Sequence, residues 1–228
     1  MTDYLIDIAS YQNGINLDVV KANGFTKVNI KISQGNWYTW ANAPTYISQA
    51  QDKGFGISTF HWLDNSASGS VQAQYAQNLI RKYGGSIGWA HQCDCEDKSK
   101  PATWTIWRDY VNSMQDFFGR HIVNYTGDWW WSAHMGNNNG AAITPYLWAA
   151  PNRGYTGTYT GDESTDWYAG YGGWGDYSLL QYGVSSITNA GGGDLSKTAI
   201  RDPEVWGALT GVEASSGTRT QDWWMWEQ

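Results

Sequence analysis

The sequence predicts an α/β fold, a single barrel of mainly parallel strands that is irregular on one side. Strand-like and helix-like segments alternate through the first 125 residues, which is typical of parallel strands joined by helical crossovers. Beyond that point the helical pattern fades, and strand-like segments are joined by loops rich in Gly and Tyr. The length of 228 residues fits one barrel without a second core.

The helices are indicated by their start and stop residues. A short helix is expected after Asn16 and before Gly24, and the clearest one has Ser70 as its candidate N-cap and ends at Gly84. In chain order we expect strand Leu5–Ile8, helix Leu17–Ala22, strand Lys27–Ser33, helix Thr45–Lys53, strand Gly56–Trp62, helix Val71–Tyr83, strand Trp89–Glu96, helix Trp104–Phe118, strands His121–Tyr125, Tyr146–Ala150 and Leu179–Tyr182, and a short strand at Asp194.

The barrel is expected to occupy residues 1–206, followed by a linker or tail over residues 207–228. Residues 207–221 are small and polar, as in a flexible linker. The last seven residues are too apolar for a free tail, so they either dock on the barrel or lead into a second module.

Composition excludes several classes of protein. No run of about 18 apolar residues is present, so we expect no membrane span, and the N-terminus lacks the pattern of a secretory signal. A net charge of −7 argues against a nucleic-acid partner. Cys93 and Cys95 are two residues apart in a strand, and such a pair does not readily form a disulfide. We therefore expect reduced, structural thiols.

Four acidic residues lie at the ends of predicted strands. Asp94 and Glu96 lie two residues apart in one strand and should point to the same side. Asp7 ends the first strand and Asp194 the last, and parallel barrels gather their chemistry at these strand ends. Crowded carboxyls raise one another's pKa, and a proton donor beside a second carboxylate is the equipment for cleaving a glycosidic bond.

The aromatic content also suits a carbohydrate ligand. The chain holds 16 Trp and 15 Tyr but only 5 Phe, and Trp and Tyr combine an apolar face with a polar edge, as sugars do. For any single Trp, packing in the core is the more common role. His91, Cys93 and Cys95 lack the spacing of a zinc site, so no metal and no cofactor are expected.

Eight short segments resemble, in the same order, the glycoside hydrolase family 25 lysozymes. Among them, Ile6–Gln12 resembles the family's G-I-D-V-S-x-Y-Q, and Asp94–Glu96 resembles D-x-E; Gln34 stands where the family often has Glu. The remaining segments are Asn29–Gly35, Thr59–Trp62, Asn124–Thr126 with Trp129 and Trp130, Leu147–Ala150, Leu180–Tyr182 and Asp194–Leu195.

The resemblance implies a TIM-like (β/α)5(β)3 barrel that cleaves the β-1,4 bond between N-acetylmuramic acid and N-acetylglucosamine. It implies Glu96 as proton donor with Asp94 as its partner, and Asp7 and Asp194 as further acids lining the site. Candidate sugar contacts are Tyr11, His61, Trp62, Tyr125, Trp148, Gln181 and Tyr182. His61 is as readily a hydrogen-bonded core histidine as a sugar contact.

The expected partner is bacterial peptidoglycan, and the expected state is a monomer. Two alternatives remain open, namely a chitinase-like hydrolase of N-acetylglucosamine polymers and a non-catalytic wall-binding module. The resemblance also suits a phage endolysin made in a host cytoplasm and released to the wall, or else a secreted lysozyme. In either case the tail could lead to a wall-binding module.

Overall fold

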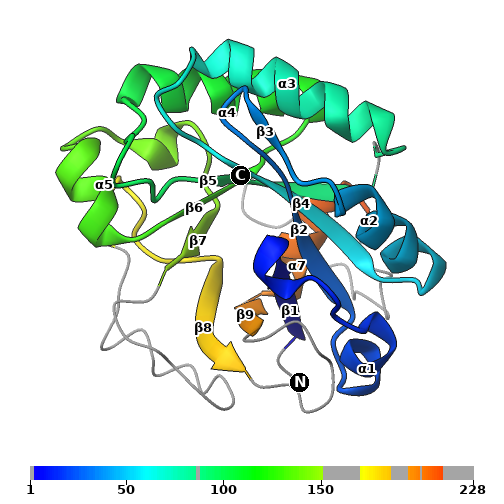
Figure 1. The fold of residues 1–228 in the computed structure, drawn as a ribbon. Coiled ribbons are helices and arrows are strands. Elements are labelled where there is room, and N and C mark those ends of the chain that lie inside the picture. Colours follow the sequence, from blue (N-terminus) through cyan, green and yellow to red (C-terminus); the bar gives the residue numbers. More distant parts are fainter. Residues whose placement is uncertain (1–2, 86–87, 151–169, 186–194, 201, 213–228) are drawn as a thin grey trace, which may run out of the picture.

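The computed structural model describes residues 3–85, 88–150, 170–185, 195–200 and 202–212, and forms a closed barrel surrounded by helices (Figure 1). The strands are β1 Asp3–Ile8, β2 Lys27–Gln34, β3 Tyr38–Thr39, β4 Gly56–Trp62, β5 Trp89–Asp94, β6 Val123–Thr126, β7 Leu147–Ala149, β8 Leu179–Ser185 and β9 Leu195–Ile200.

The sheet closes because β1 pairs with both β2 and β9. Around the barrel the order is β1, β2, β4, β5, β6, β7, β8 and β9, and β3 extends from β2. All neighbours from β1 through β8 are parallel, whereas β9 is antiparallel to both β8 and β1. The predicted α/β barrel is confirmed, and the antiparallel β9 accounts for its irregular side.

The helices cover the outside of the barrel (Figure 1). Asn16 caps the first helix through its side chain, Ser68 and Thr103 cap two others, and Gly119 ends the longest in a left-handed conformation. The helices are α1 Leu17–Ala22, α2 Ala43–Asp52, α3 Gly69–Lys82, α4 Trp104–Phe118, α5 Asp128–His134 and α7 Pro203–Thr210, with short 3-10 turns η1 Ser10–Gln12 and η2 Gly140–Ala142. None of the helices in the described part of the chain is long and apolar enough to cross a membrane.

The structure differs from the sequence prediction in several places. The N-cap of α3 is Ser68 rather than Ser70, because the Ser68 hydroxyl reaches the Val71 amide. Helix α5 was not expected, since three consecutive Trp residues are not a usual helical pattern, but two of the three are buried and hold it on the barrel. Helix α7 runs past the boundary expected at residue 206, with Leu209 buried. The chain therefore belongs to the barrel through Thr210, and residues 213–228 lie outside the described part.

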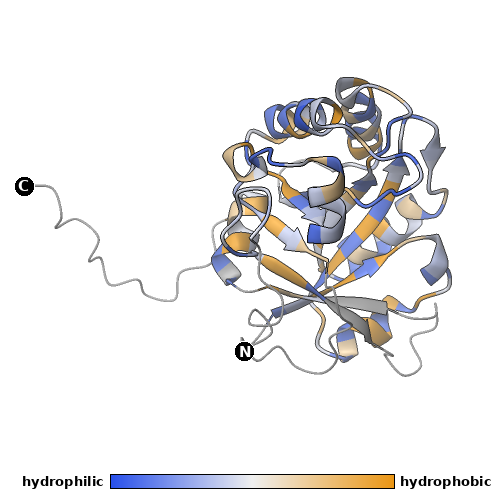
Figure 2. Cartoon of the chain, turned by 90° about the vertical axis from the view of Figure 1, so that its left-hand side faces the viewer, coloured by the Kyte–Doolittle hydropathy of each residue, from blue (hydrophilic) through white to orange (hydrophobic). Residues whose placement is uncertain are grey.

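Apolar side chains form two separate layers because successive strand residues face opposite sides. One layer lies between the sheet and the helices and includes Ile6, Ile8 and the fully buried Trp107. The other fills the lower part of the barrel and includes Leu5, Ala90 and Leu179. Figure 2 shows apolar and polar residues alternating along the strands. Toward the C-terminal ends of the parallel strands, polar residues point into the barrel.

Candidate active site

A hydrogen-bonded network crosses the barrel interior around Asp7. The Asn29 amide, on β2, donates to Asp7 Oδ1 at 2.6 Å and to Gln92 Oε1 at 2.7 Å. The Thr198 hydroxyl, on β9, donates to Asp7 Oδ2 at 3.4 Å. Side chains from β2 and β9 therefore hold the Asp7 carboxyl in place, and Gln92 on β5 supports Asn29. Sequence reasoning singled out Asp7 and missed its partners Asn29, Gln92 and Thr198.

The Asp94–Glu96 segment departs slightly from its predicted form. Strand β5 ends at Asp94, so Glu96 lies beyond it rather than within it. Its position is still fixed by β6, because the Cys95 amide donates to the Tyr125 carbonyl at 2.9 Å and the Thr126 hydroxyl donates to the Cys95 carbonyl at 2.8 Å. Asp94 is 5% exposed and its Oδ1 has no hydrogen-bond partner among the described residues, whereas Glu96 is only partly buried.

Electrostatics show that the three described acids form one cluster. Burial, followed by repulsion from Glu96, raises the pKa of Asp94 well above its usual value. Burial also raises the pKa of Glu96, against the attraction of Lys31 and Lys98. Burial raises the pKa of Asp7 to about 7, which its hydrogen bonds oppose and the charge of Glu96 reinforces. Carboxyls that keep their protons near neutral pH are suited to general-acid catalysis. The fourth predicted acid, Asp194, lies outside the described residues.

Asp97 and Lys31 complete this cluster, and neither was singled out from the sequence. Asp97 accepts hydrogen bonds from the Ser99 and Lys100 amides and from the Trp62 indole. Burial alone would raise the pKa of Asp97, but these hydrogen bonds lower it. Lys31 lies over the Trp62 ring, 4.6 Å from its centre. The sequence could have indicated Lys31, because it lies two residues after Asn29 in β2 and therefore shares its inward-facing side.

Most of the predicted sugar contacts lie in or near this interior. The Tyr125 hydroxyl donates to Gln181 Oε1 at 2.7 Å. Trp148 packs edge-on against Tyr125 and is 1% exposed, and its indole N–H has no hydrogen-bond partner in the described part of the chain. Tyr11 lies in η1, directly after β1, and is 88% exposed. Residue 182 belongs to β8, but its side chain lies outside the described part.

The prediction of His61 as a sugar contact is wrong, because its side chain points away from the acids. Its Nδ1 pairs with the Ser33 hydroxyl at 2.8 Å, its Nε2 pairs with Gln72 at 3.2 Å, and its ring stacks on Tyr110 of α4. His61 is fully buried and faces the helices, on the opposite side of β4 from the acids. Strand alternation explains this, because Trp62 takes the inward position next to it.

His91, Cys93 and Cys95 also face the helices. His91 bonds the Tyr110 hydroxyl at 2.8 Å, and the two cysteines are buried, free thiols with their sulfurs 3.5 Å apart. Across the ranges that the structure describes, no group of three or more His, Cys, Asp or Glu residues is placed to hold a metal ion.

Aromatic side chains are also exposed shortly after strand ends, in the turn after β2 and at the start of helix α5. Trp37 follows β2, is 57% exposed and donates its indole N–H to Asp64 at 3.1 Å. Trp129 follows β6 and lies under the Lys98 ammonium, which is 4.3 Å from its ring centre. The other tryptophans with described side chains are largely packed inside, including Trp107, Trp130 and Trp131. Among the residues that the structure describes, most tryptophans therefore belong to the core.

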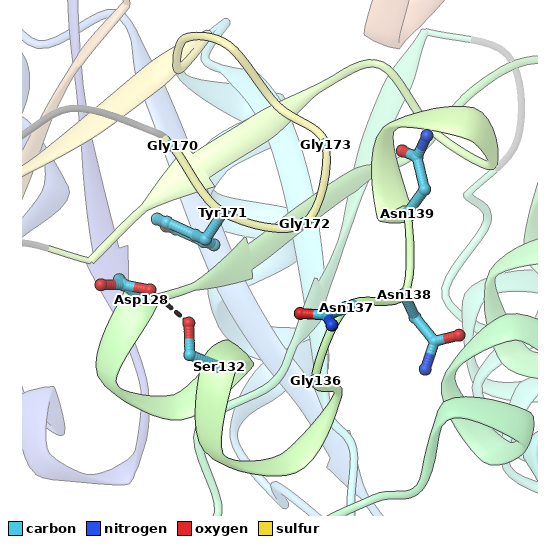
Figure 3. Close-up of a pocket in the computed structure, with 10 residues that line it drawn as sticks. All are labelled: Asp128, Ser132, Gly136, Asn137, Asn138, Asn139, Gly170, Tyr171, Gly172 and Gly173. Carbon is cyan, nitrogen blue, oxygen red and sulfur yellow. Dashed lines mark hydrogen bonds between the residues drawn. The ribbon is translucent and has the colours of Figure 1, made fainter.

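A separate polar cavity of about 400 Å³ lies between α5 with the loop that follows it and the segment before β8 (Figure 3). Figure 3 shows the Ser132 hydroxyl donating to Asp128, with Tyr171 beside them. The other lining residues are Gly136, Asn137, Asn138, Asn139, Gly170, Gly172 and Gly173. None of the residues predicted for the site lines this cavity, so it is distinct from the acid cluster.

Comparison with known proteins identifies the family. Residues 6–189 match the model of glycosyl hydrolases family 25. The chain belongs to this family. It is therefore a glycoside hydrolase, and the acids predicted from the sequence lie within the matched region, apart from Asp194. No curated protein sequence matches the chain significantly.

Solved structures of similar fold include fungal and bacterial enzymes. A muramidase from Trichobolus zukalii is 24% identical, with a TM-score of 0.71 and coverage of 92% of this chain and 99% of that one. A family GH25 lysozyme from Aspergillus fumigatus is 20% identical, with a TM-score of 0.74 and coverage of 92% and 100%. A lysozyme from Streptomyces coelicolor is 19% identical, with a TM-score of 0.71 and coverage of 93% and 99%. At these identities the likeness establishes the fold.

Proposed function

We propose that the protein is an N-acetylmuramidase that hydrolyses the β-1,4 bond between N-acetylmuramic acid and N-acetylglucosamine in bacterial peptidoglycan. The observation that carries the proposal is the cluster of Asp7, Asp94 and Glu96 in the barrel interior, in which burial raises the pKa of all three carboxyls and the charge of Glu96 raises those of Asp7 and Asp94 further. Such a cluster keeps a proton available for a leaving oxygen at neutral pH.

Glu96 acts as the proton donor in this proposal. It lies beyond the end of β5, is more exposed than Asp94, and is held by the hydrogen bonds of the Cys95 amide to the Tyr125 carbonyl and of the Thr126 hydroxyl to the Cys95 carbonyl. A glycosidic oxygen needs a carboxyl that a polymer can approach from outside, and Glu96 meets this requirement better than the enclosed Asp94. A protonated Glu96 gives its proton to the leaving sugar oxygen as the C–O bond breaks.

Asp94 acts as the partner carboxylate. Its Oδ1 is buried without a hydrogen-bond partner in the described residues, so it is free to interact with a substrate group. It stabilises the positive charge that develops at the anomeric carbon, either by direct attack or by holding the sugar's own acetamido group as the nucleophile. Water then completes hydrolysis, with Glu96 taking up a proton as general base. Asp7, fixed by Asn29, lines the same space.

Two similar structures support this choice of substrate. The Trichobolus zukalii protein is described as a muramidase. The modular autolysin LytC from Streptococcus pneumoniae, 16% identical over 87% of this chain, is described in complex with a synthetic peptidoglycan ligand. A chitinase-like activity and a wall-binding module without activity are the competing assignments.

Analysis of the reducing ends of digested walls tests the proposal. Purified peptidoglycan is incubated with the enzyme, the products are reduced with borohydride, and the reduced sugar is identified by mass spectrometry. A muramidase yields reduced N-acetylmuramic acid. Reduced N-acetylglucosamine would indicate a glucosaminidase, release of oligomers from chitin alone would indicate a chitinase, and wall binding without products would indicate a binding module.

A further inference from the structure

The loop that follows Glu96 carries two exposed lysines that reach to opposite sides. The Lys98 ammonium lies 4.3 Å from the ring centre of Trp129, in the helix after β6. The Lys100 ammonium lies 5.8 Å from the ring centre of Trp37, in the turn after β2. Strand β5 lies between β4 and β6, and β2 lies on the far side of β4. The two ammonium groups therefore flank the end of β5, where Glu96 stands.

The backbone of this loop is fixed by hydrogen bonds to three parts of the chain. Asp97 Oδ1 accepts the Ser99 amide at 2.8 Å and the Lys100 amide at 2.9 Å, within the loop itself. The Trp130 indole, on α5, donates to the Asp97 carbonyl at 2.9 Å. The Asn65 amide, after β4, donates to the Lys100 carbonyl at 3.1 Å. The lysine side chains therefore extend from a defined backbone.

The two tryptophans are held beside their lysines. The Trp37 indole donates to Asp64 Oδ2 at 3.1 Å. The Trp129 ring lies close over Gly127, where an added Cβ would stand 2.3 Å from the indole nitrogen. An aromatic face attracts a cation without neutralising it. The rings therefore orient the two ammonium groups and leave their charges available to an anion.

Within the described ranges, neither lysine forms an ion pair. The ion pairs found there are Lys27 with Asp3, Lys53 with Asp18 and Arg108 with Asp109. The acids next to the two lysines and their rings, Asp97 and Asp64, accept hydrogen bonds from amide, hydroxyl and indole groups instead. The chain as a whole carries a net charge of −7. Two oriented cations beside the proposed proton donor are therefore a local exception to an acidic protein.

We propose that Lys98 and Lys100 bind the free carboxylates of the stem peptide carried by muramic acid, and so make the peptide-bearing glycan the preferred substrate. The proposal rests on the proposed function, because it takes peptidoglycan as the polymer that is cut. The stem peptide begins at the lactyl group of the sugar whose bond is broken, and Lys98 lies two residues after Glu96. Carboxylates attached to that sugar pass close to this loop. Chitin carries no such acids, so the same lysines favour peptidoglycan over it.

The test compares two soluble forms of one glycan fragment, prepared free of teichoic acid. One has free stem-peptide carboxylates, and in the other they are converted to primary amides, so that only the charges differ. The ratio of kcat/KM between the free and the amidated form is measured for each variant. Lys98 also lowers the pKa of Glu96, and the loss of that effect acts on both forms alike, so the ratio removes it.

We expect Lys98→Met and Lys100→Met each to lower this ratio about two- to fivefold, the size of one exposed ion pair, and the double variant to lower it about tenfold. Lys98→Arg and Lys100→Arg, which keep the charge, should retain most of the preference. Lys82→Met, a matched change at the exposed end of α3, should retain all of it. Added salt should reduce the ratio in the wild type and leave the double variant unchanged.

A ratio that stays at the wild-type value in the double variant would overturn the proposal. A dependence on the lysines that appears only with fragments carrying teichoic acid would assign them to phosphate and overturn it as well. Calorimetric binding of both fragment forms to Glu96→Gln, with and without the two lysines, needs no turnover. Lysine-dependent preference for the free form in a protein whose wild type cuts no wall would reject the proposed function and keep the lysine site; wall cleavage without that preference would do the reverse.

Discussion

Asn29 donates a hydrogen bond of 2.6 Å to Asp7, which links the second strand of the barrel to the first at the level of the acids. The same amide reaches Gln92 on β5, so its orientation is fixed from both sides. A donor to a carboxyl stabilises the ionised form. Asn29 therefore limits how far burial raises the pKa of Asp7.

Replacing Asn29 should change the titration of Asp7. In Asn29→Ala the lowering hydrogen bond is lost, so the pKa of Asp7 should rise above its value of about 7. The unpaired groups should also cost about 1–3 kcal/mol of folding free energy. 13C NMR of the carboxyl measures the first effect and urea unfolding the second. Asn137→Ala, at an exposed position, is the control, and an unchanged Asp7 midpoint in Asn29→Ala would show that the bond has no electrostatic role.

Asp7 should make the fold less stable as pH rises. Its folded pKa of about 7 lies above the ordinary 3.8, so the folded state holds a proton that the unfolded state loses between these values. Stability is highest below about pH 4 with respect to this group and falls as pH rises toward 7, by at most about 4 kcal/mol. Asp7→Asn removes this dependence. Urea unfolding at pH 4.5 and pH 8 measures the free energy of unfolding, and the difference between Asp7→Asn and the wild type should favour the variant more at pH 8. An equal difference at the two pH values would refute this prediction.

His61 should matter for stability and not for turnover. Its ring bonds Ser33 and Gln72 and stacks on Tyr110, all away from the acids. His61→Gln should lose about 1–3 kcal/mol of folding free energy at pH 7, with kcat/KM within about twofold of wild type for the folded fraction. Thermal unfolding and steady-state kinetics measure the two. His121→Gln, on an exposed ring, is the control. A loss of kcat/KM in His61→Gln without a loss of stability would show that His61 takes part in the active site.

Tyr11 should contribute to substrate affinity alone. It is 88% exposed directly after β1, and stacking of one aromatic ring is worth about 0.5–1.5 kcal/mol. Tyr11→Ala should therefore raise KM for peptidoglycan fragments roughly 2- to 10-fold and leave kcat unchanged. Val212→Ala, at an exposed position beyond α7, is the matched control. Equal KM values in Tyr11→Ala and Val212→Ala would show that Tyr11 does not bind the substrate.

The sequence was most informative where a residue pattern is compatible with one local structure, as at strand ends and helix caps. The positions of Asp7 and Asp94 at strand ends predicted that they share one end of the barrel, and capping residues such as Asn16 located helices. It was less informative for Asn29 and Lys31. A polar residue that faces the barrel interior and one that faces solvent give the same alternating pattern in a strand, and only the closed barrel distinguishes them. His61 was misplaced for a related reason: its neighbour Trp62 faces inward, and only the register of β4 decides which of the two does. Helix α5 was missed because burial of Trp130 and Trp131, rather than local propensity, holds it.

The central claim is that Glu96 supplies the proton that breaks the glycosidic bond. Glu96→Gln keeps the shape of the side chain and removes the proton, so kcat for peptidoglycan fragments should fall about a thousandfold. The thermal unfolding midpoint should not fall, because the variant removes a buried carboxyl that burial disfavours when charged. Clearing of purified walls by Glu96→Gln at the wild-type rate would contradict the account.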